Sequence, residues 1–284
     1  MRTVFLLSSG RSGTTYLAQF VRANARCTVR HEPYLDIGNP TLFGRPIHEG
    51  ANGEKRKVLE LLRRKKEWIE KNGRPNYFEA NHALIKAAHD LLPLCFPEAW
   101  YVHAVRNPLY VAKSEANREE LLDRLHFPWR RYVSTEGKSF LRWALTGEEA
   151  VYRFFDDRPL SRFQWYVVQW IEIENRIVRL LRREGGADRC FFLSTPADFK
   201  DGDKLEAMLS FLKIERRAGS KLDGRRSSLR RNRTPGKPTL VTKSDHREFR
   251  AVIDRLPDEY LEIFAEPPYD ALEWRHVFGR GPGK

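Results

Sequence analysis

The chain has few cysteines and no long apolar stretch, and both absences restrict what the protein can be. Its three cysteines, Cys27, Cys95 and Cys190, are odd in number and follow no metal-ligand spacing. This excludes a disulfide scaffold and a zinc finger, and it predicts a reducing, cytoplasmic location. No run approaches the ~20 apolar residues of a membrane span, and the apolar stretch after Thr3 is too short for a signal-peptide core.

Acidic residues are also in the minority. The 284 residues include 51 Lys and Arg against 38 Asp and Glu, a formal net charge of +13, so an anionic partner is expected. Hydrophobic residues make up 41% of the chain, which is enough apolar surface for a sizeable core and excludes a wholly disordered protein. No internal repeat or nucleic-acid-binding module is visible. One domain over residues 1–284 is therefore expected, without nucleic acid as a partner.

Short apolar runs alternate with helical patterns along the chain. This alternation predicts an α/β fold of three layers, with a central, mostly parallel sheet and helices on both faces. Residues 34–52, rich in Gly, Pro and Asn, are expected to be an irregular loop. Strands are expected at 3–7, 27–30, from 77, at 101–105 and at 190–193, and helices at 15–24, 53–72, 83–92, 109–118, 161–183, 203–212 and 244–256.

Two segments interrupt the alternation. Residues 119–160 are rich in aromatic side chains and are expected to form a helical insertion. Its aromatic residues would either line an acceptor pocket or form the core of a small cap. Residues 213–238 are very basic with almost no apolar side chains, which predicts a mobile basic loop.

A turn rich in Gly and Ser follows the first predicted strand and precedes a helix. It has the sequence SSGRSGTT over residues 8–15. In an open α/β sheet ligands bind in this position, and the N–H groups and dipole of the following helix favour an anion. Gly10 and Gly13 allow the backbone to approach the anion, Arg11 supplies a fixed charge, and the two threonine hydroxyls can donate hydrogen bonds. The turn therefore predicts a phosphate-binding loop.

This loop departs from the Walker A sequence G-x-x-x-x-G-K-[ST]. Ser8 stands in place of the first glycine and Thr14 in place of the lysine, so that only Gly13 and Thr15 fit. Because the Walker lysine neutralises the β- and γ-phosphates, its absence argues against ordinary ATP or GTP hydrolysis. A turn that only caps a helix is the alternative.

A second motif of this kind lies about 95 residues downstream. A predicted strand ends in Arg106-Asn107-Pro108, and Ser114 follows eight residues after the arginine. Proline suits the first turn of a helix, where its missing N–H costs nothing. The guanidinium group of Arg106 can donate two parallel hydrogen bonds to a phosphate, and the hydroxyl of Ser114 can donate a third. The two motifs together predict two anion contacts.

At these motifs the chain resembles the sulfotransferase superfamily, and its bacterial or carbohydrate-type branch more than the cytosolic aryl branch. The family's 5′-phosphosulfate loop has the sequence [KR]-S-G-[TS]-[TS], which residues 11–15 fit at every position. Its 3′-phosphate motif is R-[DN]-P with a serine eight residues after the arginine. The resemblance implies a P-loop-like fold that binds 3′-phosphoadenosine-5′-phosphosulfate (PAPS), releases the bisphosphate PAP and requires no metal.

The resemblance also implies a role for each matching residue. Tyr16 would stack near adenine, although a core tyrosine is the alternative. The Tyr-Glu-Asp that relatives carry after the strand at 190–193 is missing from this chain. The implied cofactor contacts are Arg11, Ser12, Gly13, Thr14 and Thr15 on the phosphosulfate, Arg106 and Ser114 on the 3′-phosphate, and Arg231 and Arg233 in a basic loop that closes over the same phosphate.

Sulfuryl transfer needs a group that removes the acceptor proton, which typically contributes 10²- to 10⁴-fold. Glu32 follows the second predicted strand and resembles the glutamate base of several carbohydrate and bacterial sulfotransferases. His82 lies near the Lys-[ST]-His of the cytosolic branch, but the lysine of that triplet is absent. We favour Glu32, with His82 as the alternative. Arg11 is the cation expected to stabilise the leaving oxygen.

The predicted function is therefore in-line transfer of a sulfuryl group from PAPS to an acceptor hydroxyl, or to an amine, on a carbohydrate or small molecule. One alternative is a divergent P-loop phosphotransferase that uses ATP. Another is a non-catalytic nucleotide- or glycan-binding protein of the same fold. Nucleotide and metal dependence distinguish the first alternative, and lack of turnover distinguishes the second.

Overall fold

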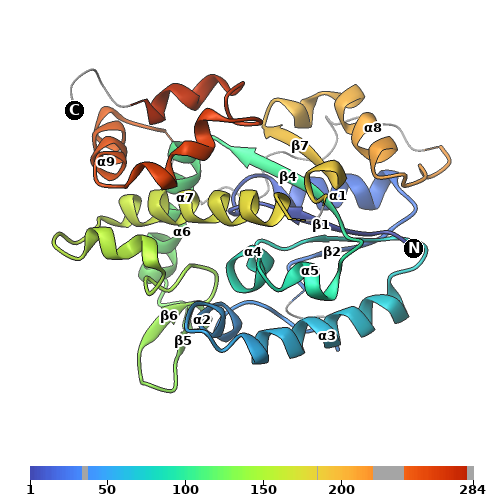
Figure 1. Cartoon of the computed structure of the whole chain (residues 1–284), viewed down its shortest axis with the longest axis horizontal. Coiled ribbons are helices and arrows are strands. Elements are labelled where there is room, and N and C mark those ends of the chain that lie inside the picture. Colours follow the sequence, from blue (N-terminus) through green and yellow to red (C-terminus); the bar gives the residue numbers. More distant parts are fainter. Residues whose placement is uncertain (34–37, 184, 220–239, 280–284) are drawn as a thin grey trace.

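The computed structural model describes residues 1–33, 38–183, 185–219 and 240–279 (Figure 1). Its centre is a five-stranded sheet in which every pair of neighbours is parallel, with the order β2-β3-β1-β4-β7. The strands are β1 (Thr3–Leu7), β2 (Thr28–His31), β3 (Tyr77–Ala80), β4 (Trp100–Arg106) and β7 (Cys190–Thr195). The predicted α/β class with a mostly parallel sheet is confirmed.

Helices cover both faces of this sheet (Figure 1). They are α1 (Thr14–Asn24), α2 (Arg45–Ala51), α3 (Lys55–Asn72), α4 (Ala83–Ala88), α5 (Leu92–Cys95), α6 (Pro108–Arg124), α7 (Arg162–Leu181), α8 (Gly202–Phe211) and α9 (Lys243–Ile253). Because strand side chains alternate between faces, Val4 and Leu6 pack with α1 and α8, whereas Phe5 and Leu7 pack with the other helices. The central strand is thus buried on both sides.

The connections place β1 at a topological switch point. After β1 the chain crosses one face through α1 to reach β2, whereas the connections after β3 and β4 run through helices on the opposite face. β1 lies between β3 and β4, so the carboxyl ends of these three parallel strands lie side by side at one edge of the sheet. In open α/β sheets this is where ligands bind.

The prediction of an irregular loop over residues 34–52 is wrong in its second half, which forms α2. Pro46 occupies the first turn of this helix, and Ile47 is buried in the core. Gly50 allows close packing on α4, because a Cβ at that position would lie 2.4 Å from the backbone oxygen of Ala87. Pro46 and Gly50, which suggest a loop in the sequence, are instead part of a short helix that packs tightly on α4.

The aromatic segment over residues 119–160 also differs from the expected helical insertion. α6 continues to Arg124, and a hairpin of β5 (Arg131–Val133) and β6 (Ser139–Leu141) follows. Tyr152 and Phe155 are buried in the main core, and Phe140 is buried against His48 and Tyr132. These buried aromatic side chains stabilise the fold, whereas Phe127, Trp129 and Phe154 are exposed.

The predicted basic loop over residues 213–238 lies mainly outside the described residues, as do Arg231 and Arg233. Within the ranges that are described, no helix combines the length and apolar composition needed to cross a bilayer.

Candidate functional site

The loop between β1 and α1 has a backbone shaped for close approach of a ligand. Gly10, Arg11 and Gly13 have φ angles of 95°, 52° and 87°, which lie in the left-handed region. Ser12 Oγ donates to Gly10 O at 3.1 Å and braces the turn. Gly13 is the N-cap of α1 and makes no side-chain cap, and the N-terminus of a helix at such a loop favours an anion. Left-handed backbone at a non-glycine residue such as Arg11 is concentrated at functional sites.

Phe199 covers one side of this loop. A Cβ at residue 13 would lie 2.4 Å from Phe199 Cε2. The Phe199 ring stacks on Tyr16 with centroids 4.9 Å apart, and Tyr16 Oη donates to Phe199 O at 2.8 Å. Tyr16 is only 5% exposed. Its ring therefore occupies the core position considered for it, with Phe199 on its face.

Gly13→Ala is expected to lower the free energy of unfolding by about 2–4 kcal/mol, because a left-handed alanine is strained and its Cβ clashes with Phe199. Urea denaturation measures this loss. Gly53→Ala is the matched control, since Gly53 also has a positive φ of 79° but nothing lies within 4 Å of its Cβ position. The Gly53→Ala variant should lose only about 1 kcal/mol of unfolding free energy, because backbone strain is the only cost there. Equal losses in the two variants would contradict the packing argument.

The second motif lies directly against this loop. Arg106 Nη1 donates to Arg11 O at 2.9 Å, and Arg11 Nε donates to Ser114 Oγ at 2.8 Å. Asn107 caps α6 by accepting from Leu109 N at 3.0 Å, so the motif is held at the start of the helix. Residues that are 95 and 103 positions apart in the chain thus form one cluster.

This cluster concentrates positive charge in a partly buried place. Burial lowers the pKa of both Arg11 and Arg106, and the charge of Arg118 lowers the pKa of Arg11 further. The carboxylates of Glu115 and Glu32 oppose that shift for Arg11. An anionic ligand would stabilise the charged guanidinium groups in the same way.

Glu32 and His82, the two candidate bases, lie together as a pair. Glu32 follows β2 with a left-handed φ of 47°, and its N–H donates to Ala80 O at 3.0 Å. Its Oε1 lies 3.3 Å from His82 Nε2. The sequence presents these residues as alternatives, whereas the structure joins them in one unit.

The protonation states of this pair follow from its surroundings. Burial raises the pKa of the Glu32 carboxyl, but the hydrogen bond and charge of His82, with the charges of His31 and Arg118, outweigh it and lower this pKa to about 2. Burial and the charge of Lys86 lower the pKa of His82 to about 4. At neutral pH the pair is therefore a carboxylate beside a neutral imidazole, and Glu32 can accept a proton.

A buried ion pair, which the sequence analysis missed, supports the turn that carries His82. Lys65 and Glu79 are both fully buried, with Nζ 3.0 Å from Oε2. Glu79 Oε1 also accepts from Asn81 Nδ2 at 2.9 Å, and Asn81 Oδ1 accepts from Ala83 N at 3.0 Å. This chain of contacts connects α3 to the first residue of α4. It fixes His82, which lies between Asn81 and Ala83 in the sequence.

His31 is a second missed residue. Its Nε2 lies 3.3 Å from Thr14 Oγ1 and 3.2 Å from Thr15 Oγ1, so the end of β2 contacts the phosphate loop directly. Its position in the sequence could have identified it, because it is a polar residue at the carboxyl end of a strand and next to Glu32.

Further charged groups lie behind the loop. Glu115 Oε2 pairs with Arg118 Nη2 at 2.6 Å, and Glu115 Oε1 lies 3.2 Å from the position of a Gly10 Cβ. Burial lowers the pKa of Lys86 to about 7. Arg118 lies over the ring of Trp143 at 4.7 Å, and Lys86 Nζ donates to Trp143 O. The aromatic segment thus reaches the site through Trp143.

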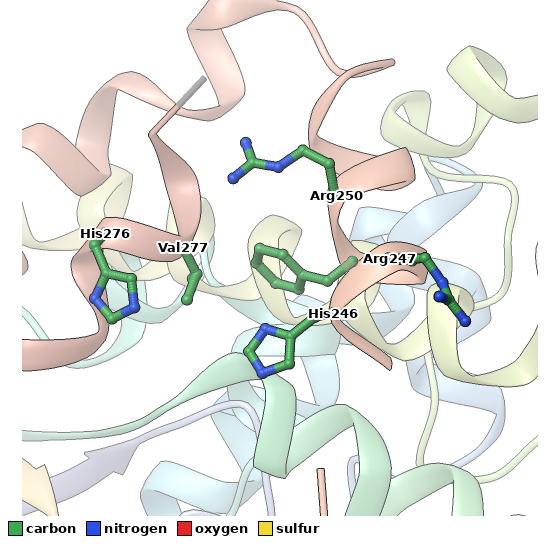
Figure 2. Close-up of a pocket in the computed structure, with 6 residues that line it drawn as sticks. His246, Arg247, Arg250, His276 and Val277 are labelled. Carbon is green, nitrogen blue, oxygen red and sulfur yellow. The ribbon is translucent and has the colours of Figure 1, made fainter. Parts of the chain in front are cut away.

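A separate cavity of about 370 Å³ lies between α9 and the turn η7 (Glu273–Phe278) (Figure 2). Figure 2 shows His246 and Arg250 projecting from α9, and His276 and Val277 from the turn. None of its lining residues comes from a strand end or the phosphate loop. It is distinct from the candidate site.

The function of this site has to be inferred from its geometry. No protein-family model matches the chain, and no curated protein matches it. Among the described residues, no three His, Cys, Asp or Glu side chains are placed to hold a metal ion. The fold and site define an α/β protein with a glycine-rich loop, a cluster of arginines and a Glu-His pair at one edge of its parallel sheet.

Proposed function

We propose that the protein transfers a sulfuryl group from PAPS to an acceptor hydroxyl by in-line displacement. The observation that carries this proposal is the contact between the two motifs, in which Arg11 bonds both Arg106 and Ser114. A nucleotide with an anionic group at each end of its ribose needs two adjacent cationic contacts. The loop would hold the 5′-phosphosulfate, and Arg106 with Ser114 would hold the 3′-phosphate.

The chain's own residues can support this reaction without a further group. Glu32 takes the acceptor proton as the acceptor oxygen bonds to sulfur and the bond from sulfur to the bridging oxygen breaks. His82 holds the Glu32 carboxylate through the contact at 3.3 Å. Arg11 and the N–H groups of α1 stabilise the charge that develops on the leaving phosphate.

The arrangement at Thr14 favours this reaction over phosphotransfer from ATP. Thr14 stands where a Walker loop has its lysine, and its hydroxyl contacts His31. A loop without that lysine lacks the ion that neutralises the β- and γ-phosphates.

Calorimetric titration with PAP in the absence of magnesium, beside ATP with and without it, tests the proposal. PAP should bind and ATP should not match it. Arg106→Ala should weaken PAP binding about 10- to 100-fold, because charge-assisted hydrogen bonds are lost. Arg124→Ala, at the exposed end of α6, should leave PAP affinity unchanged. Binding of ATP alone, dependent on magnesium, would indicate a phosphotransferase, and no binding of either would reject both enzymes.

A further inference from the structure

His31 lies between the phosphate loop and the Glu-His pair. Its Nε2 is within hydrogen-bond distance of the hydroxyls of Thr14 and Thr15, and 3.9 Å from Glu32 Oε1. Its side chain is 24% exposed, so it remains within reach of solvent protons. An unprotonated imidazole nitrogen can accept a hydrogen bond from a hydroxyl group, and both threonine hydroxyls lie within reach of this one.

Charged groups of both signs face His31. Glu32 adjoins it on the same strand end, Arg22 faces it from α1, and His82 lies beyond Glu32 at the start of α4. Burial lowers the pKa of His31, Glu32 raises it and Arg22 lowers it, with a net decrease. His31 is therefore neutral at neutral pH while no anion is bound.

We propose that His31 is a further residue of the anion site, which takes up a proton when the 5′-phosphate group binds and then donates a hydrogen bond from Nε2 to that group. This inference rests on the proposed function. As the anion binds, the hydroxyls of Thr14 and Thr15 turn toward its oxygens, and Nε2 loses the donors that favoured its neutral form. The added negative charge stabilises the imidazolium, and the proton comes from the buffer.

The sign of the pH dependence follows from linkage. Anion binding raises the pKa of His31, so the complex binds more protons than the free protein between the two pKa values. Affinity for PAP should therefore rise as pH falls through the pKa of His31 in the complex, and the His31 contribution should level off below its pKa in the free protein. The slope of this contribution is at most about tenfold in affinity per pH unit.

Calorimetric titration of the full chain with PAP, in two buffers of different ionisation enthalpy at about pH 5.5 to 8, measures this proton uptake directly. Because the phosphates of PAP titrate in the same range, the wild-type protein is compared with His31→Gln, in which the ligand's own contribution is unchanged. His276→Gln is the matched control, since it removes an exposed histidine from the separate cavity.

Uptake approaching one proton, absent in His31→Gln and retained in His276→Gln, supports the proposal. A net proton change that is the same in the wild-type protein and in a folded His31→Gln overturns it, because the phosphates of PAP or another group then account for the proton. If His31→Gln does not fold, His31→Asn takes its place in this comparison. If PAP does not bind at any pH, the proposed function itself fails.

Discussion

Glu32→Gln is expected to reduce the turnover number of sulfuryl transfer by roughly 10²- to 10⁴-fold while PAP affinity is retained. The amide keeps the size of the side chain and its contact with His82, but it cannot take a proton from the acceptor. Since the pKa of Glu32 is about 2, the carboxylate is fully ionised across the neutral range and the wild-type base is always available. The substitution therefore removes the reaction step and leaves the fold intact.

Turnover can be followed as PAP release from PAPS, with the acceptor that gives the highest rate in a panel of mono- and oligosaccharides. Titration with PAP on the same variant separates chemistry from binding. His82→Gln provides the comparison, because loss of the neighbour that holds Glu32 should cost less than loss of the base. A Glu32→Gln variant with wild-type turnover would remove Glu32 from the mechanism, and a larger loss in His82→Gln would transfer the role of base to the histidine.

The parts of the site that the sequence predicted are those that depend on local pattern and on strand ends. The apolar run at residues 3–7 and the SSGRSGTT turn predict a strand and a phosphate loop from neighbouring residues alone. Arg106 ends another buried strand, and parallel strands present their carboxyl ends at one edge, so its approach to Arg11 follows once β1 and β4 are neighbours. The same reasoning placed Glu32 and His82 at one crevice.

The parts that were missed depend on contacts between distant segments. Nothing near Lys65 distinguishes it from the other cations of its basic helix; it is buried because α3 packs beneath β3, where Glu79 points to the same interior. Tyr16 follows a phosphate-loop pattern, but Phe199, 183 residues away, covers its ring. His31 gains its role only when β2 ends beside α1. Packing of this kind has no signature in a single sequence.

Lys65→Met is expected to lower the free energy of unfolding by about 3–5 kcal/mol, which is the usual cost of leaving one partner of a buried ion pair without the other. Glu79 would keep the hydrogen bonds from Tyr77 Oη at 2.5 Å and Asn81 Nδ2 at 2.9 Å, but these donors carry no charge. Urea denaturation gives the loss. Lys66→Met, the next residue along α3, is the matched control, since its side chain is 46% exposed and pairs with Glu70 only at 4.0 Å. It should change stability by less than about 1 kcal/mol.

The double variant Lys65→Met with Glu79→Gln distinguishes the ion pair from simple packing. If the loss in Lys65→Met comes from an uncompensated carboxylate, neutralising Glu79 should recover a large part of it, because the two substitutions then act on one interaction. If instead the lysine stem only fills space, the two losses should add. Because Asn81 bonds both Glu79 and the first N–H of α4, the single variant should also lower turnover without weakening PAP binding. That combined result would indicate that the ion pair of Lys65 and Glu79 sets the position of His82 against Glu32.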